Sequence, residues 1–202
     1  MSTFEVEIKF RVNNITLSEF ERQLQQRFGG TKFSDPVTES DSFFQHPCRN
    51  FIQTDECLRL RNRLFSDGTS KHFLTYKGPK IDTRTKTRQE IELPITEPES
   101  LENLLLALGF YPSASVRKYR RRMALTHEHR HVEIVFDTLP DLPESARSFI
   151  EMETISTTEE IDECRKLILR LADQLGLSEP IRDSYLKLVQ NETARPDEAQ
   201  HQ

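Results

Sequence analysis

Tryptophan is absent from this chain of 202 residues, and cysteine is scarce, with three copies. Cys48, Cys57 and Cys164 are odd in number and widely spaced, which argues against a disulfide framework and against a cysteine metal site. No apolar run approaches the length needed to cross a membrane, and the first residues lack the hydrophobic stretch of a signal peptide. We therefore expect a cytoplasmic protein with reduced cysteines and no membrane partner.

A strong excess of one charge is also missing. The net charge is −5, although 30% of the residues are charged. This balance gives no reason to expect a nucleic-acid partner, and the basic runs 59–63 and 120–122 lack aromatic platforms on which bases could stack. The length indicates one domain, which we place at residues 1–190. Residues 191–202 have almost no apolar side chains and are predicted to be a disordered tail.

The chain does contain strict alternation of apolar and charged residues. In residues 4–12, which read F-E-V-E-I-K-F-R-V, every second side chain is apolar and the four between them are ionisable. This period of two predicts a strand with one apolar face and one charged face. An edge strand with its charges in water would show the same pattern, but the pattern recurs along the chain.

Seven further segments are predicted to be strands, so the chain has eight in all. They are residues 4–12, 38–44, 58–63, 71–77, 86–93, 115–124, 132–138 and 149–155. Most of them follow one another as hairpin-like pairs, and eight antiparallel strands suffice to close a barrel. We expect an α+β fold, in which a closed eight-stranded antiparallel barrel carries charges in its lumen and helices on its apolar outside. The alternative is a large open sheet with solvated charges.

Helices are predicted after the first, fifth and eighth strands. Capping boxes at Thr16 and Thr96, and a cap at Thr157, precede apolar residues at helical spacing. These helices are expected to extend to residues 28, 108 and 176. A last short helix is predicted from Ser178 to about residue 190, and residues 80–85 are predicted to be a mobile basic loop.

The charged faces indicate metal and phosphate chemistry. Carboxylates at positions i and i+2 of a strand can share a hard divalent cation such as Mg²⁺ or Mn²⁺. Rows of Arg and Lys match phosphate oxygens. Carboxylates that hold a metal beside bases that hold phosphate are the general arrangement for phosphoryl transfer. The acids are Glu5, Glu7, Asp41, Glu90, Glu92, Asp137, Glu151 and Glu153, and the bases are Lys9, Arg59, Arg61, Arg63, Lys77, Lys86, Arg88, Lys118, Arg120 and Arg122.

An ordered set of motifs resembles the CYTH superfamily, the triphosphate tunnel metalloenzymes. Residues 4–9 match its E-x-E-x-K signature, and the resemblance continues to residue 190. The segments H-P at 46–47, T-D-E-C-L-R-L-R at 54–61 and Y-K-G-P at 76–79 are most similar to the class IV adenylate cyclase (CyaB-like) branch. The link at 139–148 departs from that branch, because it is longer and lacks glycine.

The resemblance implies a tunnel that binds a triphosphate with a divalent metal. It also implies that Lys9 assists catalysis. The metal ligands it implies are Glu5, Glu7, Glu92, Asp137, Glu151 and Glu153. The phosphate-binding residues it implies are Lys9, Arg59, Arg61, Lys77, Arg88, Lys118, Arg120 and Arg182.

Several other charged or polar residues are given structural interpretations. Arg63, Lys71, Lys86 and Arg122 are predicted to be surface charges near strand ends. The alternating histidines 127, 129 and 131 are interpreted as an exposed hairpin turn rather than a metal site, and Tyr185 as a ring packed under the barrel rather than a proton donor.

Three functions fit these observations. The first is a class IV adenylate cyclase-like activity, which converts ATP to cyclic AMP and pyrophosphate. The second is a triphosphatase acting on tripolyphosphate, thiamine triphosphate or a nucleotide, and the third is a non-catalytic polyphosphate-binding module. The expected cofactor is Mg²⁺ or Mn²⁺, the expected partner is a small-molecule triphosphate, and a homodimer is left open.

Overall fold

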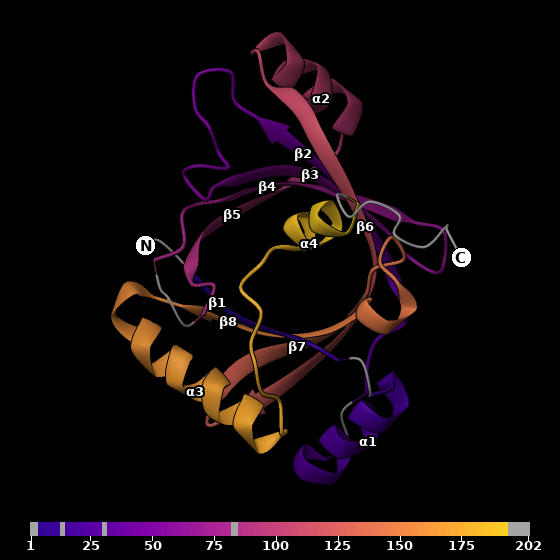
Figure 1. The fold of residues 1–202 in the computed structure, drawn as a ribbon, viewed down its shortest axis with the longest axis vertical. Coiled ribbons are helices and arrows are strands. Elements are labelled where there is room, and N and C mark those ends of the chain that lie inside the picture. Colours follow the sequence, from indigo (N-terminus) through magenta and orange to yellow (C-terminus); the bar gives the residue numbers. More distant parts are fainter. Residues whose placement is uncertain (1–3, 13–14, 30–31, 82–84, 194–202) are drawn as a thin grey trace, which may run out of the picture.

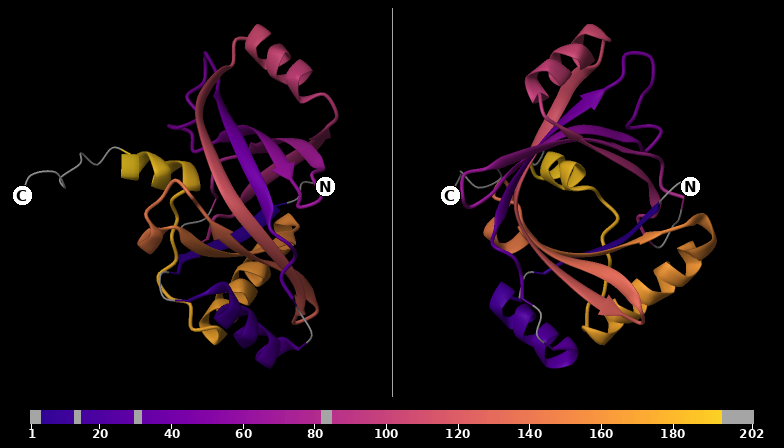
Figure 2. Two further views of the ribbon diagram at one scale, coloured as in Figure 1. Left: turned by 90° about the vertical axis from the view of Figure 1, so that its right-hand side faces the viewer. Right: turned by 180° about the vertical axis from the view of Figure 1, so that it is seen from behind.

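The barrel predicted from the alternation is confirmed in the computed structural model, which describes residues 4–12, 15–29, 32–81 and 85–193 (Figures 1 and 2). All paired strands are antiparallel, and their order around the barrel is β1-β5-β4-β3-β2-β6-β7-β8. The strands are β1 Phe4–Arg11, β2 Val37–Gln45, β3 Cys57–Leu64, β4 Ser70–Lys77, β5 Arg88–Ile95, β6 Tyr111–His127, β7 Arg130–Thr138 and β8 Ser148–Ser156.

Strand β1 closes the barrel because it pairs with β5 on one side and with β8 on the other. Its register places Glu7 opposite Glu153 and Lys9 opposite Glu151. The charged face of β1 points inward, since Glu5, Glu7 and Lys9 are all buried. A solvated strand face would leave these side chains exposed, so the open-sheet alternative is excluded for this strand.

Helices α1 (Leu17–Phe28) and α3 (Ile161–Gln174) cover the outside of β1, β7 and β8 (Figure 1). The predicted capping box of α1 is confirmed, because the Thr16 hydroxyl accepts from the Glu19 backbone and the Glu19 carboxylate accepts from the Thr16 backbone. The largest apolar core lies between these helices and the sheet. Its members include Val6, Ile8, Phe10, Phe20, Leu24, Met123, Ile134, Ile150, Met152, Cys164, Leu167, Ile168 and Leu171.

Helix α2 (Pro98–Ala107) lies on the opposite side of the molecule and packs Leu105 on a smaller core with Phe44, Phe51, Leu58 and Leu60 (Figure 1). The capping box predicted at Thr96 is wrong. The cap position falls on Glu97, which makes no side-chain cap hydrogen bond. Proline favours the first helical position because its φ is already helical, so the helix begins at Pro98 and Thr96 lies one residue too early.

The predicted start of the helix after β8 is also wrong. A 3-10 helix, Thr158–Glu160, comes first, and α3 begins at Ile161 without a side-chain cap. Arg130 donates to the Glu160 carboxylate at 2.9 Å, so this acid pairs with the β6–β7 hairpin. That hairpin turns at Glu128 and His129, which both have positive φ, as the turn interpretation of the histidines expects.

The last helix, α4 (Tyr185–Thr193), begins later and ends later than predicted. Residues 178–184 run along the barrel instead, where the Ile181 N–H donates to the Lys9 carbonyl at 2.7 Å. The Ser184 hydroxyl then accepts from the Lys187 N–H, which gives the helix its start. Residues 191–193 therefore belong to α4 and not to a tail, while 194–202, like residues 82–84 of the predicted basic loop, lie outside the described residues.

Helix α4 lies across one end of the barrel (Figures 1 and 2). Tyr185 packs there in a third core with Val116, Leu139, Leu142 and Phe149. The link 139–148 supplies two of these residues and contains a second 3-10 helix, Glu144–Ala146. None of the helices in the described part of the chain is both long enough and apolar enough to span a membrane.

Candidate active site

The barrel encloses a cavity of about 960 Å³, which is lined by the charged faces of the strands and by α4. All eight residues predicted to bind phosphate line this cavity, including Arg182 from the segment before α4. Five of the six predicted metal ligands line it as well. The exception is Asp137, which is fully buried behind Arg120 and Tyr185.

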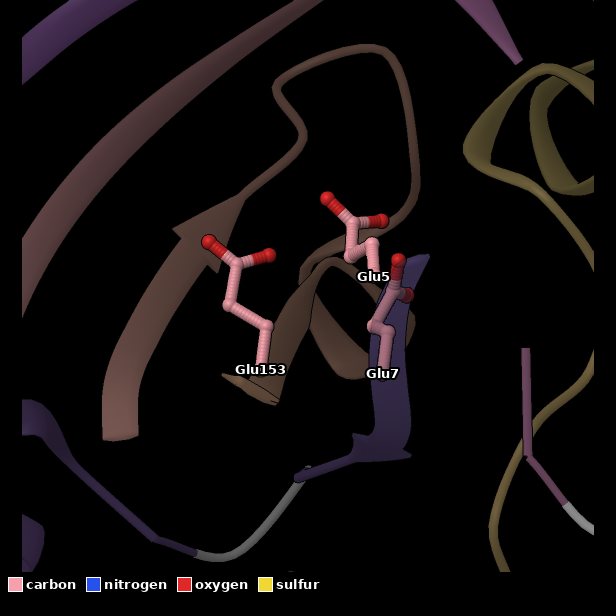
Figure 3. A group of neighbouring side chains, drawn as sticks. All are labelled: Glu5, Glu7 and Glu153. Carbon is pink, nitrogen blue, oxygen red and sulfur yellow. The ribbon is translucent and has the colours of Figure 1, made fainter. Parts of the chain in front are cut away.

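Glu5, Glu7 and Glu153 form a carboxylate cluster whose potential ligand oxygens all lie within 4.8 Å of one another (Figure 3). The strands create this cluster directly. Glu5 and Glu7 are two residues apart on β1, and Glu7 lies opposite Glu153 on β8. Such a group of oxygen ligands suits a hard divalent cation.

The electrostatics of this cluster support the same interpretation. Burial raises the pKa of Glu153 well above its ordinary value, and repulsion from Glu5 and Glu133 raises it further. Burial also raises the pKa of Glu5, although Lys77 at 2.7 Å opposes the shift. Lys77 pairs with Glu5 and Lys86 pairs with Glu7, but Glu153 makes no ion pair with any described residue. Three carboxylates thus share two lysines, so the cluster is short of positive charge and fits a divalent metal, which Glu5, Glu7 and Glu153 would hold.

The other predicted metal ligands contact cations of the protein. Asp137 accepts two hydrogen bonds from Arg120, at 2.8 and 2.5 Å, and one from the Tyr185 hydroxyl at 2.8 Å. Glu151 pairs with Lys9 at 3.0 Å and with Arg120 at 2.5 Å. Although burial opposes it, the attraction of Lys9 and Arg120 keeps the pKa of Glu151 well below its ordinary value. Glu92 lies apart from the cluster, 3.5 Å from Arg63.

The predicted phosphate-binding residues divide into paired and unpaired cations. Arg61 makes a bidentate pair with Asp41, at 2.6 and 2.7 Å. Arg88 is buried, with an exposed fraction of 9%, yet it makes no ion pair with any described residue. The Nε atoms of Arg59 and Arg88 are buried without a hydrogen-bond partner in that same part of the chain. Arg59 also donates from Nη1 to Asp41 at 3.3 Å, whereas Arg88 has no carboxylate partner among the described residues. A buried guanidinium nitrogen without a partner is costly unless an anion contacts it, so this wall of the cavity is suited to phosphate.

Lys9 lies between the two groups. Its Nζ is 3.0 Å from Glu151 and 3.5 Å from the centre of the Tyr185 ring. Burial and repulsion from Lys86 lower the pKa of Lys9 to about 7, against the attraction of Glu151. An amine with this pKa can accept a proton near neutral pH, which is the requirement for a general base.

Sequence reasoning placed three cavity residues incorrectly on the surface. Lys86 is 3% exposed, and its Nζ lies 2.8 Å from Glu7. Its segment precedes β5 and runs beside β1, where the Lys86 N–H donates to the Glu7 carbonyl. Arg63 and Arg122 also line the cavity and contact Glu39. Only Lys71 is exposed as predicted.

Two acids that lie on the predicted charged faces were left out of the candidate site. Glu39 is completely buried among the arginines of β3 and β6, and Glu133 lies opposite Glu153. Both share a strand face with an acid that was selected, Asp41 and Asp137 respectively. The period of two could therefore have found them. The Tyr185 ring is buried against Phe149 as interpreted, and its hydroxyl is bound to Asp137.

A family model described as the CYTH domain matches residues 3–185. The chain belongs to the CYTH domain family. The match covers nearly the whole described barrel and ends within the first turn of α4.

Individual relatives extend this likeness. "Putative adenylate cyclase MJ0240" from Methanocaldococcus jannaschii is 33% identical over 187 residues, which are 91% of this chain and 97% of the relative. The structure of the PH1819 protein from Pyrococcus horikoshii OT3 is 36% identical with a TM-score of 0.78, and covers 93% of this chain and 98% of its own. A third relative is the Hippeastrum protein "Putative adenylyl cyclase HpAC1", whose description reports a dominant triphosphatase activity. It is 17% identical with a TM-score of 0.58, and the match covers 93% of this chain and 95% of that protein. At this identity the likeness shows the fold alone.

Proposed function

We propose that this protein is a divalent-metal-dependent enzyme that acts on a triphosphate. One observation carries the proposal: a carboxylate cluster short of positive charge shares a cavity with the buried and unpartnered guanidinium nitrogens of Arg59 and Arg88. A metal–phosphate complex supplies the positive charge to the first group and the negative charge to the second. Membership of the CYTH domain family supports the same class of substrate.

The residues would divide the work as follows. Glu5, Glu7 and Glu153 hold Mg²⁺ or Mn²⁺, which when bound neutralises phosphate charge and lowers the pKa of the attacking hydroxyl. Asp137 and Glu151 keep Arg120 and Lys9 in place, and Glu92 lies beyond the metal site. The phosphate oxygens are held by Arg59, Arg61, Lys77, Arg88, Lys118, Arg120 and Arg182.

The reaction we propose first is that of an adenylate cyclase, since the relative from Methanocaldococcus jannaschii carries that name. The ribose 3′-oxygen of ATP forms a bond to the α-phosphorus, and the bond from that phosphorus to the bridging oxygen of the β-phosphate breaks. Pyrophosphate leaves with the bonding electrons. Lys9, which is partly neutral near pH 7, accepts the proton of the hydroxyl.

A triphosphatase is the second candidate, and one observation favours it. The cavity walls consist mainly of charged side chains that match phosphate and metal, and these groups recognise no particular substituent on the triphosphate. In this reaction the oxygen of water forms a bond to the terminal phosphorus, and Lys9 accepts its proton. The bond from that phosphorus to the bridging oxygen breaks, and the rest of the substrate leaves with the bonding electrons. The substrate could then be tripolyphosphate, thiamine triphosphate or a nucleotide.

The test is to incubate the protein with ATP and, separately, with tripolyphosphate, each with Mg²⁺ or Mn²⁺. Cyclic AMP with pyrophosphate identifies the cyclase, and orthophosphate identifies the triphosphatase. Lys9→Met should remove either activity, whereas Arg11→Met, at the exposed end of the same strand, should retain it. Binding without any product from either substrate would leave only a binding module and overturn the proposal.

A further inference from the structure

Five side chains of alternating charge lie at the end of the barrel away from α4, on five strands of which β3, β2, β6 and β7 are successive neighbours and β5 is separated from β3 by β4. In order they are Glu92 on β5, Arg63 on β3, Glu39 on β2, Arg122 on β6 and Glu133 on β7. The successive ion pairs measure 3.5, 2.9, 2.6 and 3.3 Å. We call these five residues the charge belt.

Glu39 is the centre of the belt. One of its oxygens, Oε1, accepts from both Arg63 and Arg122. The other lies 2.9 Å from Arg61 and 3.2 Å from Lys118. Although burial opposes it, the attraction of these cations keeps the pKa of Glu39 well below its ordinary value. Glu39 is therefore a permanent negative charge at the place where the belt meets the predicted phosphate-binding residues.

The charge belt contains three acids and two arginines, so its net charge is negative. Arg63 and Arg122 each lie between two carboxylates, Glu39 and an outer acid. Arg61 is also paired with two carboxylates, whereas Arg88 has no carboxylate partner among the described residues. On β3, Arg59, Arg61 and Arg63 are two residues apart, so each step moves about 7 Å along the strand. The row of cations thus continues to the belt, where the acids outnumber the arginines.

We propose that the charge belt sets the length of the phosphate chain that the tunnel accepts, with Glu39 as the residue that determines this specificity. The inference rests on the proposed function and deepens it. A chain with a fourth phosphate would have to approach Arg63 and Arg122, whose guanidinium groups are occupied, and would meet the charges of Glu39, Glu92 and Glu133. Like charges brought together in a partly desolvated site repel strongly. The tunnel therefore binds a triphosphate and rejects a longer polyphosphate.

The experiment compares tripolyphosphate with tetrapolyphosphate, each as its Mg²⁺ complex, by calorimetric titration of the full chain. The native protein should bind tripolyphosphate about tenfold more tightly or better, the size expected for one unfavourable charged contact. Glu39→Gln should improve tetrapolyphosphate binding more than tripolyphosphate binding and reduce this preference about tenfold. Arg121→Gln, which faces outward between two inward residues of β6, is the matched control and should leave the preference unchanged.

Substitution of the belt arginines tests the same inference without removing a buried acid. Arg63→Gln and Arg122→Gln should each leave the tripolyphosphate dissociation constant within about twofold, because these side chains bind Glu39 and not the ligand. If either variant weakens tripolyphosphate as much as Arg59→Ala does, the belt is part of the phosphate site and the inference is overturned.

A variant that fails to fold does not leave the inference untested. Should Glu39→Gln not fold, Glu92→Gln releases one partner of Arg63 and should shift the preference in the same direction by a smaller factor. An unchanged preference in the folded variants would overturn the inference. If the native protein bound neither polyphosphate, the proposed function itself would fall, which is a different outcome from binding without length selectivity.

Discussion

Two groups of carboxylates face the same tunnel and have opposite electrostatics. Burial raises the pKa of Glu5 and Glu153. Asp41 and Glu151 are buried just as deeply, yet neighbouring arginines and lysines keep the pKa of each well below its ordinary value. The first group is short of positive charge and suits a metal. The second group consists of counter-ions that hold in place the cations predicted to bind phosphate.

The comparison teaches that strand register, and not residue type, separates a metal ligand from a counter-ion. Glu151 and Glu153 are two residues apart on β8 and point to the same side. Glu151 lies opposite Lys9 on β1, whereas Glu153 lies opposite Glu7 on β1 and Glu133 on β7. One step of two residues along a strand thus moves a carboxylate from a cation to two other acids.

The largest expected effect comes from removing the group that is short of positive charge. Glu5→Gln combined with Glu153→Gln should lower metal-dependent turnover on the order of a thousandfold, because a bound metal contributes several kcal/mol to the transition state. Without metal, the free energy of unfolding should change little, since the loss of repulsion at Glu153 offsets the loss of the Glu5–Lys77 ion pair and Lys77 keeps Glu90 as a partner. Activity assays with Mn²⁺ and urea unfolding measure both. Glu99→Gln, an exposed acid on α2, is the control. An active double variant would refute the metal assignment.

Removing a counter-ion, in contrast, should lower the stability of the fold. Asp137→Asn should lower the free energy of unfolding by about 3 kcal/mol, because Arg120 loses a buried bidentate partner. Tyr185→Phe removes only the hydrogen bond to Asp137 and should cost about 1 kcal/mol. Urea unfolding of the two variants without metal gives these values. Full stability of Asp137→Asn would show that this acid is not a structural counter-ion.

The cations of the cavity also divide into those that should affect mainly ligand binding and those that should also affect stability. Arg88→Ala and Arg59→Ala should weaken tripolyphosphate binding by about 1.5–3 kcal/mol each, the range for hydrogen bonds to charged groups. Arg88→Ala should cost little stability, and Arg59→Ala should cost slightly more, because Asp41 loses a contact at 3.3 Å but keeps Arg61. Arg61→Ala should also destabilise the fold, because Asp41 and Glu39 lose a partner. Titration calorimetry and thermal melts separate the two effects, with Arg11→Ala as the exposed control. Equal destabilisation by Arg88→Ala and Arg61→Ala would contradict the distinction.

The smallest effect concerns pH. The folded protein holds the Glu153 proton more tightly than the unfolded chain, whose carboxyl has the ordinary value of 4.5. The free energy of unfolding without metal should therefore fall as pH rises above 4.5, by at most about 1.4 kcal/mol per pH unit for this one group. Glu153→Gln should flatten the slope between about pH 5 and 6.5, below the Lys9 pKa of about 7. An identical slope in urea unfolding of both proteins would exclude Glu153 as its source.

Much of the barrel and of its lining could be predicted, because both follow from the period of two. The alternation of residues 4–12 placed Glu5, Glu7 and Lys9 on one face, and the structure turns this face inward. The same alternation of apolar and charged residues on the other strands indicates a sheet that closes into a barrel. The capping box of α1 was readable for a similar reason, since it depends on residues three apart.

The remaining features depend on contacts between segments that are distant in the sequence. Lys86 precedes its strand, and its burial follows from pairing with β1, which no local pattern indicates. The separation of Glu153 from Glu151 required the register of three strands. The start of α4 was missed because residues 178–184 first bind along β1, and Ile181 finds its hydrogen-bond partner at Lys9.

The pairing of the first strand with the last has a consequence for the order of synthesis. Glu5 and Glu7 leave the ribosome long before their partner Glu153, which lies in the last strand of the barrel. Long-range pairing of this kind is slow, and the charged strand faces stay in solvent until β8 has emerged. A nascent or truncated chain that lacks β8 therefore has neither a closed lumen nor the carboxylate cluster. The candidate site therefore forms only after β8 has been synthesised.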